Sequence, residues 1–168
     1  MKRYVLSVLV KNSSGVLARV AGLFSRRGYN IESITAGKTE KSDISRMTIT
    51  LMGDEDIVEQ LEKQLAKLED VIKIKQLNGE KSVYRELVLI KVNADEEKRS
   101  AISEIVKIFR SKIIDISANT LTIELTGDES KISALIKLME DYGIKEMVRT
   151  GLCALERGEN SISETDLE

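Results

Sequence analysis

One order of strand-like and helical segments occurs twice along the 168 residues of this chain, and it limits the available folds more than any other feature. In the first half, a run that is apolar on both faces precedes an amphipathic helical pattern. The residues expected on the apolar face of that helix are Leu17, Val20, Ala21 and Phe24. Two strand-like runs, a second helix and a last strand follow. The predicted segments are 4–10, about 15–27, 29–36, 45–52, a helix from Asp54, and 71–77.

The second half repeats this order after residue 83. Gly53-Asp54-Glu55, which precedes one helix, recurs as Gly127-Asp128-Glu129 before another. The order β-α-β-β-α-β predicts an α+β chain of two ferredoxin-like βαββαβ domains in tandem, with antiparallel sheets and the helices on one face. The predicted segments of this half are strands over 86–92, 113–116, 120–126 and 144–155, and helices from about Asp95 and Glu129.

Composition sets the expected domain boundaries. The first domain is predicted over residues 1–77 and the second over 84–156, with a polar linker over 78–83. Residues 157–168 are polar and acidic, which predicts a poorly ordered tail. Two helices cover only one side of a sheet, yet the first strand is apolar on both faces. We therefore expect a second copy or another protein to cover the remaining side.

Charge and residue usage exclude several classes of function. The 26 basic and 28 acidic residues give a net charge of −2, so no basic excess favours nucleic acid. No apolar run is long enough to span a membrane and no cleavable leader is evident, which favours a cytoplasmic location. The chain has no histidine, the commonest proton-transfer residue. Its one cysteine, Cys153, excludes an intramolecular disulfide and is expected to be buried among apolar neighbours. We predict neither catalytic residues nor a metal site.

The turn before the first helix, Asn12-Ser13-Ser14-Gly15, is the candidate binding site. Free backbone N–H groups at a helix start attract anions, and Gly15 allows a ligand to approach the backbone because it has no Cβ. Capping by Ser13 or Ser14 would account for the same residues, so the pattern alone leaves both interpretations open.

Two asparagines flank the first helix, and aliphatic residues lie beside each. Asn12 and Asn30 can offer amide groups to the ammonium and carboxylate of a ligand. Val16, Leu17 and Ile31 would surround an aliphatic side chain. This combination predicts a small apolar amino acid as the ligand. The second half has Asn93-Ala94-Asp95-Glu96-Glu97 at the equivalent turn, without glycine and with carboxylates that would repel an anion. Only the first domain is expected to bind there.

A family resemblance adds to this interpretation. The run from Asn12 to Val20, continued by Gly22 to Ser33, resembles the regulatory (small) subunits of acetolactate synthase, also called acetohydroxyacid synthase. Ser45-Arg46-Met47, Phe109-Arg110 and Arg149-Thr150-Gly151 fit the same ACT-domain family. The resemblance covers about residues 1–158, and the tail beyond it supports no claim.

The resemblance implies an N-terminal ACT domain, a C-terminal ACT-like domain and a homodimer. It implies a regulatory subunit in branched-chain amino-acid biosynthesis that binds and activates a catalytic large subunit and confers feedback inhibition by valine. Thiamine diphosphate, Mg²⁺ and FAD are expected on the large subunit and no cofactor on this chain. In the family, valine lies at the ACT dimer interface. The implied valine-binding residues are Asn12, Gly15, Val16 and Leu17 from one chain, with Asn30 and Ile31 from its mate.

Two other functions remain in view. One is a stand-alone amino-acid-sensing ACT protein that regulates a different partner or transcription, although no helix-turn-helix or basic patch is evident. The other is a self-sufficient enzyme, which the missing histidine and cofactor motifs disfavour.

Overall fold

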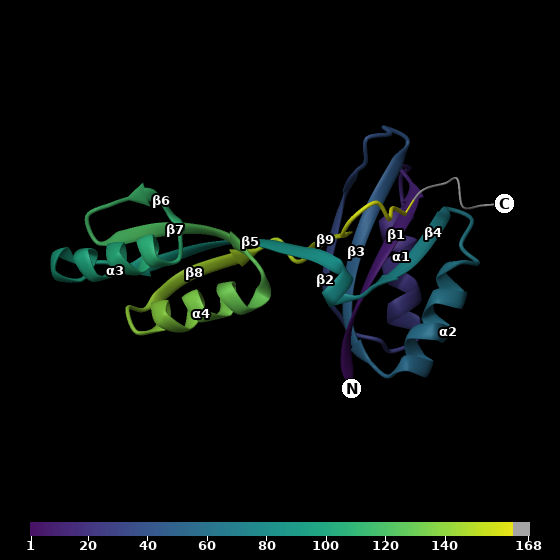
Figure 1. Cartoon of the computed structure of the whole chain (residues 1–168), viewed down its shortest axis with the longest axis horizontal. Helices are drawn as coiled ribbons and strands as arrows, with labels where there is room; N and C mark the ends of the chain where they lie inside the picture. Colours follow the sequence, from purple (N-terminus) through teal and green to yellow (C-terminus); the bar gives the residue numbers. More distant parts are fainter. Residues whose placement is uncertain (163–168) are drawn as a thin grey trace. The chain divides into compact units, whose positions relative to one another are not determined.

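Two compact units make up the chain, and each combines an antiparallel sheet with two helices (Figure 1). The computed structural model describes residues 1–162. Of the described residues, the first unit contains 1–83 and 152–162, and the second contains Tyr84–Gly151. In both units one apolar core joins the helices to the sheet, so the predicted α+β fold of two tandem βαββαβ domains is confirmed.

The first unit has the sheet order β2-β3-β1-β4, so β1 is central and β2 and β4 are the edge strands. Register pairs such as Leu6 with Ile49 join β1 to β3 along their full lengths. The chain reverses after α1 at Gly28, whose φ of 72° is the left-handed conformation expected there. The elements are β1 (Lys2–Lys11), α1 (Val16–Arg26), β2 (Ile31–Lys38), β3 (Ile44–Gly53), α2 (Glu55–Leu65) and β4 (Val71–Leu77).

The buried face of α1 differs from the predicted one. Its buried residues are Val16, Val20, Leu23 and Phe24. Leu17, expected in the core, is 48% exposed. The helix is rotated so that Val16 enters the core in its place, because residues 16, 20, 23 and 24 also follow the helical period. Leu17 is therefore available at the surface beside the helix start.

The second unit has the sheet order β6-β7-β5-β8. Both of its helices are capped as the acidic turns predict, since Asp95 accepts a hydrogen bond from Lys98 N and Asp128 from Lys131 N. The predicted linker contains a 3₁₀ turn, Gly79–Lys81, that leads directly into β5. The elements are β5 (Ser82–Asn93), α3 (Glu96–Ile108), β6 (Lys112–Ile116), β7 (Thr120–Gly127), α4 (Glu129–Glu140) and β8 (Ile144–Arg149). No helix within residues 1–162 is long and apolar enough to cross a membrane.

A buried ion pair joins the neighbouring strands β5 and β8 of the second unit. Arg149 donates from Nε to Glu86 Oε1 at 2.7 Å and from Nη2 to Oε2 at 2.9 Å. The Glu86 side chain is only 5% exposed, whereas that of Arg149 is 35% exposed. The hydrogen bonds from the guanidinium to Glu86 raise the pKa of Arg149, although burial opposes them. This two-point contact satisfies a carboxylate that water hardly reaches.

The returning segment from Leu152 onward bears on two predictions. Residues 152–156, expected in the second domain, include β9 (Cys153–Glu156), which pairs with β5 although the segment is grouped with the first unit. The segment alternates, so that Leu152 and Ala154 are buried while Cys153 is exposed, and the expected burial of Cys153 is wrong.

The same segment supplies part of the missing cover for the helix-free face of the first sheet. Ile162 is buried against Leu9 and Ile44 on that face. Glu156 forms an ion pair of 2.6 Å with Lys75 of β4. Of the tail predicted over 157–168, residues 163–168 lie outside the described residues. The chain itself therefore covers part of the sheet face that we expected a partner to cover.

Candidate functional site

The start of α1 differs from the start of every other helix in residues 1–162. Its N-cap is Gly15, at a φ of 83°, with no side-chain capping hydrogen bond and no acid in the first turn. The predicted capping by Ser13 or Ser14 is wrong. By contrast, α2, α3 and α4 each begin with an aspartate followed by at least one acid in the first turn. The partial positive charge at the N-terminus of α1 is thus left for another anion.

Gly15 is favoured by its backbone conformation, because the left-handed φ disfavours most other residues. A Cβ at this position would also lie 2.8 Å from Arg19 Nη1, so the end of that side chain would have to move. Arg19 is itself held by Asp70, at 2.6 Å between Nε and Oδ2. Gly15 is therefore exposed to solvent and has the ion-paired Arg19 side chain beside it.

Asn12 ties the helix-start turn to the loop between β2 and β3. Its Nδ2 donates to Ser42 O at 2.9 Å, and its Oδ1 accepts from Ser45 Oγ at 3.1 Å. Its backbone N–H donates to Asp43 O at 2.7 Å. The side chain keeps one N–H and one lone pair for a ligand. Asn12 thus positions the turn and can still contribute a hydrogen bond to a bound molecule.

A hollow of about 290 Å³ lies beside this turn. Lys11 and Lys38 add positive charge to the N-terminus of α1, which favours a carboxylate. Leu17 and Ala36 offer exposed apolar surface, and the buried side chains of Val10 and Met47 lie beneath them. The volume is near the lower end of small-molecule sites, as suits a ligand of amino-acid size. The full lining is Val10, Lys11, Asn12, Ser13, Val16, Leu17, Ala36, Gly37, Lys38, Ser45 and Met47.

Asn30 and Ile31 do not join this hollow within one chain. Ile31 pairs with Leu51, and Leu51 pairs with Tyr4 near the start of β1, whereas Asn12 follows the end of β1 at Lys11. The seven steps from Tyr4 to Lys11 at about 3.3 Å each put the two groups roughly 23 Å apart. Asn12, Val16 and Leu17 line the hollow, and Gly15 lies beside it. Asn30 and Ile31 lie at the opposite end of the sheet.

Several lining residues escaped the sequence analysis. Ala36, Gly37 and Lys38 lie at the end of β2, and Ser45 and Met47 come from β3. The alternation of β3 was the available signal, because it places Ser45 and Met47 on the face opposite Arg46. The pairing of Gly37 with Arg46 and of Lys38 with Ser45 then brings the end of β2 to the same place.

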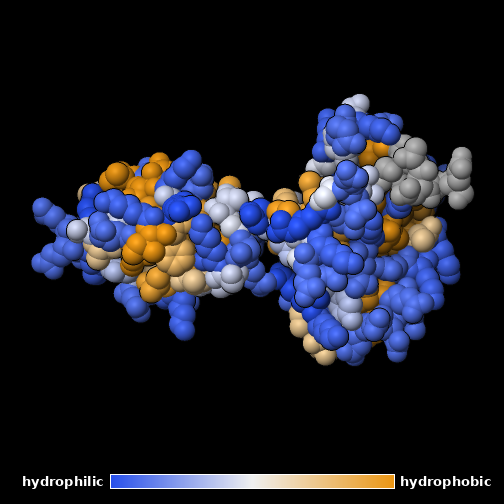
Figure 2. Space-filling model, viewed as in Figure 1, coloured by the Kyte–Doolittle hydropathy of each residue, from blue (hydrophilic) through white to orange (hydrophobic). Residues whose placement is uncertain are grey.

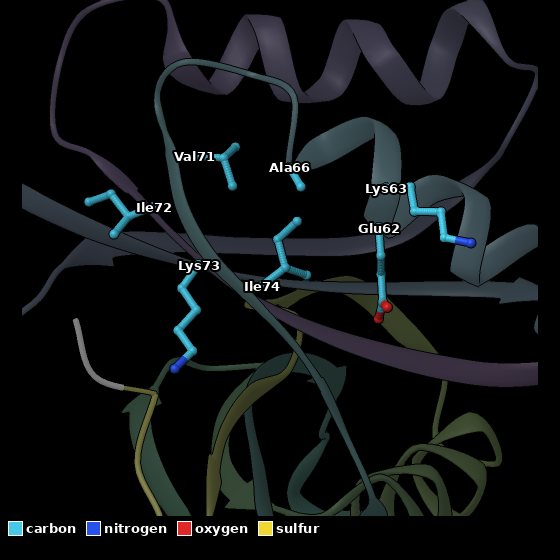
Figure 3. Close-up of a pocket in the computed structure, with 7 residues that line it drawn as sticks. All are labelled: Glu62, Lys63, Ala66, Val71, Ile72, Lys73 and Ile74. Atoms are coloured by element: carbon cyan, nitrogen blue, oxygen red, sulfur yellow. The ribbon is translucent and has the colours of Figure 1, made fainter. Parts of the chain in front are cut away.

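A second hollow, of about 330 Å³, lies between α2 and the edge strand β4 (Figure 3). Its lining residues are Glu62, Lys63, Ala66 and the strand segment 71–74. Burial raises the pKa of Glu62, and the nearby Glu59 carboxylate adds to this effect. Here Glu62 lies beside Lys63 and Lys73, whereas the lining of the hollow at α1 has two lysines, a helix N-terminus and no acid. The hollow at α1 is therefore the better site for a carboxylate.

Comparison with known proteins identifies the family. A family model described as the small subunit of acetolactate synthase matches residues 85–158, and an AHAS small subunit-like ACT domain matches residues 6–73. The chain is 56% identical over 156 residues to a probable acetolactate synthase small subunit from Archaeoglobus fulgidus, covering 93% of this chain and 98% of that protein.

Two further relatives agree over nearly the whole chain. The acetolactate synthase small subunit of Mycobacterium bovis is 50% identical over 161 residues, which are 96% of each chain. The crystal structure of the acetolactate synthase small subunit from Thermotoga maritima has a TM-score of 0.88 at 43% identity and covers 95% of this chain and 100% of its own. The chain belongs to the acetolactate synthase small-subunit family.

Proposed function

We propose that this chain regulates a catalytic large subunit of acetolactate synthase, activating it and making it sensitive to valine. The observation that carries the proposal is the hollow at the start of α1, which combines an uncapped helix N-terminus with two lysines and aliphatic surface. The carboxylate of valine would accept hydrogen bonds from the first N–H groups of α1. Its isopropyl group would contact Leu17 and Ala36, the exposed apolar residues of the lining.

A dimer through β2 would complete this site. β2 is an edge strand of the first sheet, so one side of it is open to a further strand. If two copies of Ile31–Lys38 pair antiparallel about a two-fold axis, Ile31 of one copy lies opposite Lys38 of the other. Asn30 and Ile31 of the second copy would then stand beside Ala36, Gly37 and Lys38 of the first, at the hollow. The separation of the two groups within one chain is what such a shared site requires.

Regulation then follows from the difference between the dimer with and without valine. A ligand shared by two chains fixes their relative position, which would change the surface offered to the large subunit. Coupling between two sites of this kind is typically about 1–3 kcal/mol. The thiamine diphosphate, Mg²⁺ and FAD of the reaction would be held by the large subunit, and this chain would contribute no catalytic residue.

The second unit offers surface for that contact. Figure 2 shows hydrophobic residues gathered on the otherwise mostly hydrophilic surface of this unit. Its exposed apolar side chains include Ile108 at 75%, Ile116 at 64% and Val148 at 58%. Exposed apolar patches often mark protein contacts. We assign this unit to assembly and the first unit to sensing.

Asn30→Ala tests the shared site, because Asn30 is exposed and the substitution leaves the core intact. We expect valine affinity to fall about 10-fold, the loss typical of a hydrogen bond to a charged group. Activation of the large subunit should be unchanged. Isothermal titration with valine and inhibition curves of the reconstituted holoenzyme measure the two properties. Normal valine binding by this variant would remove Asn30 from the site, and a wild-type chain that binds no valine would overturn the proposed function.

A further inference from the structure

A third hollow lies on the opposite face of the first sheet from the candidate valine site. Because side chains alternate along β3, Arg46 points away from the face that carries Ser45 and Met47. The returning C-terminal segment crosses this face and encloses a volume of about 260 Å³. The lining residues are Ser7, Arg46, Lys75, Leu77, Leu155, Glu156, Gly158, Asn160, Ser161 and Ile162.

The charges around this hollow do not cancel. Lys75 is matched by Glu156, at 2.6 Å between Nζ and Oε2. Arg46 has no hydrogen bond or ion pair with its guanidinium within residues 1–162. Burial lowers the pKa of Arg46, and the negative charge of Glu40 raises it by a smaller amount. One partly desolvated cation is therefore left without a matching anion, a costly arrangement unless a ligand supplies the charge.

Apart from the Glu156 carboxylate, which faces Lys75, the remaining polar side chains at the hollow can donate hydrogen bonds. Ser7 is only 2% exposed, and its hydroxyl has no hydrogen-bond partner within residues 1–162. Asn160 and Ser161 contribute an amide and a hydroxyl from the covering segment. A buried hydroxyl without a partner is uncommon and calls for a partner that the folded chain does not provide.

We propose that this hollow binds a small oxyanion, a carboxylate or a phosphate, with Arg46 as its principal partner. A guanidinium presents two parallel N–H groups that match two oxygens of such an anion. The Ser7 hydroxyl lies at the same hollow and can donate a further hydrogen bond. The volume accommodates a small anion with accompanying water and excludes a large ligand. The inference is independent of the proposed valine site, which lies on the other face of the sheet.

The experiment measures the melting temperature of the intact chain as a function of added anion. Phosphate, methylphosphonate, acetate and pyruvate are each compared with chloride at equal ionic strength, so that screening of surface charges is constant. An anion that binds only the folded state raises the melting temperature progressively with its concentration. Phosphate and methylphosphonate test for binding of a phosphorus oxyanion, and acetate and pyruvate test for binding of a carboxylate.

Arg46→Gln should weaken anion binding about 10-fold or more, because a charge-assisted contact is lost. Arg46→Lys, which keeps the charge without the paired N–H groups, should bind with intermediate affinity. Arg26→Gln is the matched control, since Arg26 is exposed at the end of α1, outside the hollow. It should respond to anions as the wild type does.

Two results would overturn this proposal. One is the absence of any anion-specific rise in the wild-type melting temperature, which would mean that water alone fills the hollow. The other is an equal rise in wild type and Arg46→Gln, which would place the binding elsewhere. Valine titration of the same variants tests the proposed valine site separately. Arg46→Gln should bind valine normally, so failure of the anion proposal can be distinguished from failure of the valine site.

Discussion

Replacing Gly15 by aspartate is expected to abolish valine binding, with a loss of at least about 30-fold in affinity. Three effects act together. A side chain at the left-handed φ of 83° costs about 1–2 kcal/mol, and its Cβ would displace Arg19 Nη1 from 2.8 Å. The new carboxylate would also occupy the N–H groups of α1 and repel the carboxylate of valine. The holoenzyme should remain active and become insensitive to valine.

The control for this substitution is Gly158→Asp. Gly158 also has a positive φ, of 75°, and an added Cβ there meets no atom within 4 Å. It carries the same charge and a similar backbone cost in the same unit, away from the α1 hollow. Titration calorimetry measures valine affinity, and circular dichroism checks that both variants fold. If Gly15→Asp is folded and binds valine with wild-type affinity, the start of α1 is not the site.

Glu86→Ala should destabilise the second unit by about 2–4 kcal/mol, the second-largest effect that we expect. The substitution removes both hydrogen bonds to Arg149 and leaves its guanidinium unpaired between β5 and β8. Breaking a buried pair from one side typically costs about 3–5 kcal/mol, and the 35% exposure of Arg149 reduces that cost. Hydrogen exchange of the backbone amides of β5 and β8 measures the stability of this unit by itself.

Glu146→Ala is the matched control in the same sheet. Its carboxylate lies 3.7 Å from Lys91 Nζ but is 77% exposed, so water replaces the lost contact. We expect a change of no more than about 0.5 kcal/mol. If the two substitutions lower the stability of the second unit equally, then burial of Glu86 does not make its ion pair with Arg149 important to stability.

Much of the fold follows from local patterns. The strand and helix order, the cap at Asp95 and the turn at Gly28 depend on neighbouring residues alone, and the structure has all three. The orientation of α1 is different, because two overlapping sets of residues satisfy the helical period and only packing selects between them. The return of the chain from Leu152 to the first unit is a tertiary contact that no local pattern encodes.

The residues of the candidate site also divide into those that a local pattern indicates and those that only the tertiary structure brings together. Gly15 and Asn12 could be recognised because a glycine turn before a helix has a local chemical meaning. Lys38 could not, since it reaches the hollow through the pairing of β2 with β3. The alternation of β3 indicates the face on which Met47 lies, but not that this face lies beside Gly15. The sequence indicates Asn12 as a ligand residue. Only the structure shows that its side chain also forms hydrogen bonds with Ser42 and Ser45.

The central claim is that each valine site is built from two chains, and subunit complementation tests it most directly. Heterodimers are isolated in which one chain carries Gly15→Asp and the other Asn30→Ala. In a shared site, the intact Gly15 of one chain meets the intact Asn30 of the other, so one of the two sites is restored. Calorimetry should then show half the wild-type valine stoichiometry at near wild-type affinity. Heterodimers in which no site binds valine more tightly than the sites of the Asn30→Ala homodimer do would contradict a site built from two chains.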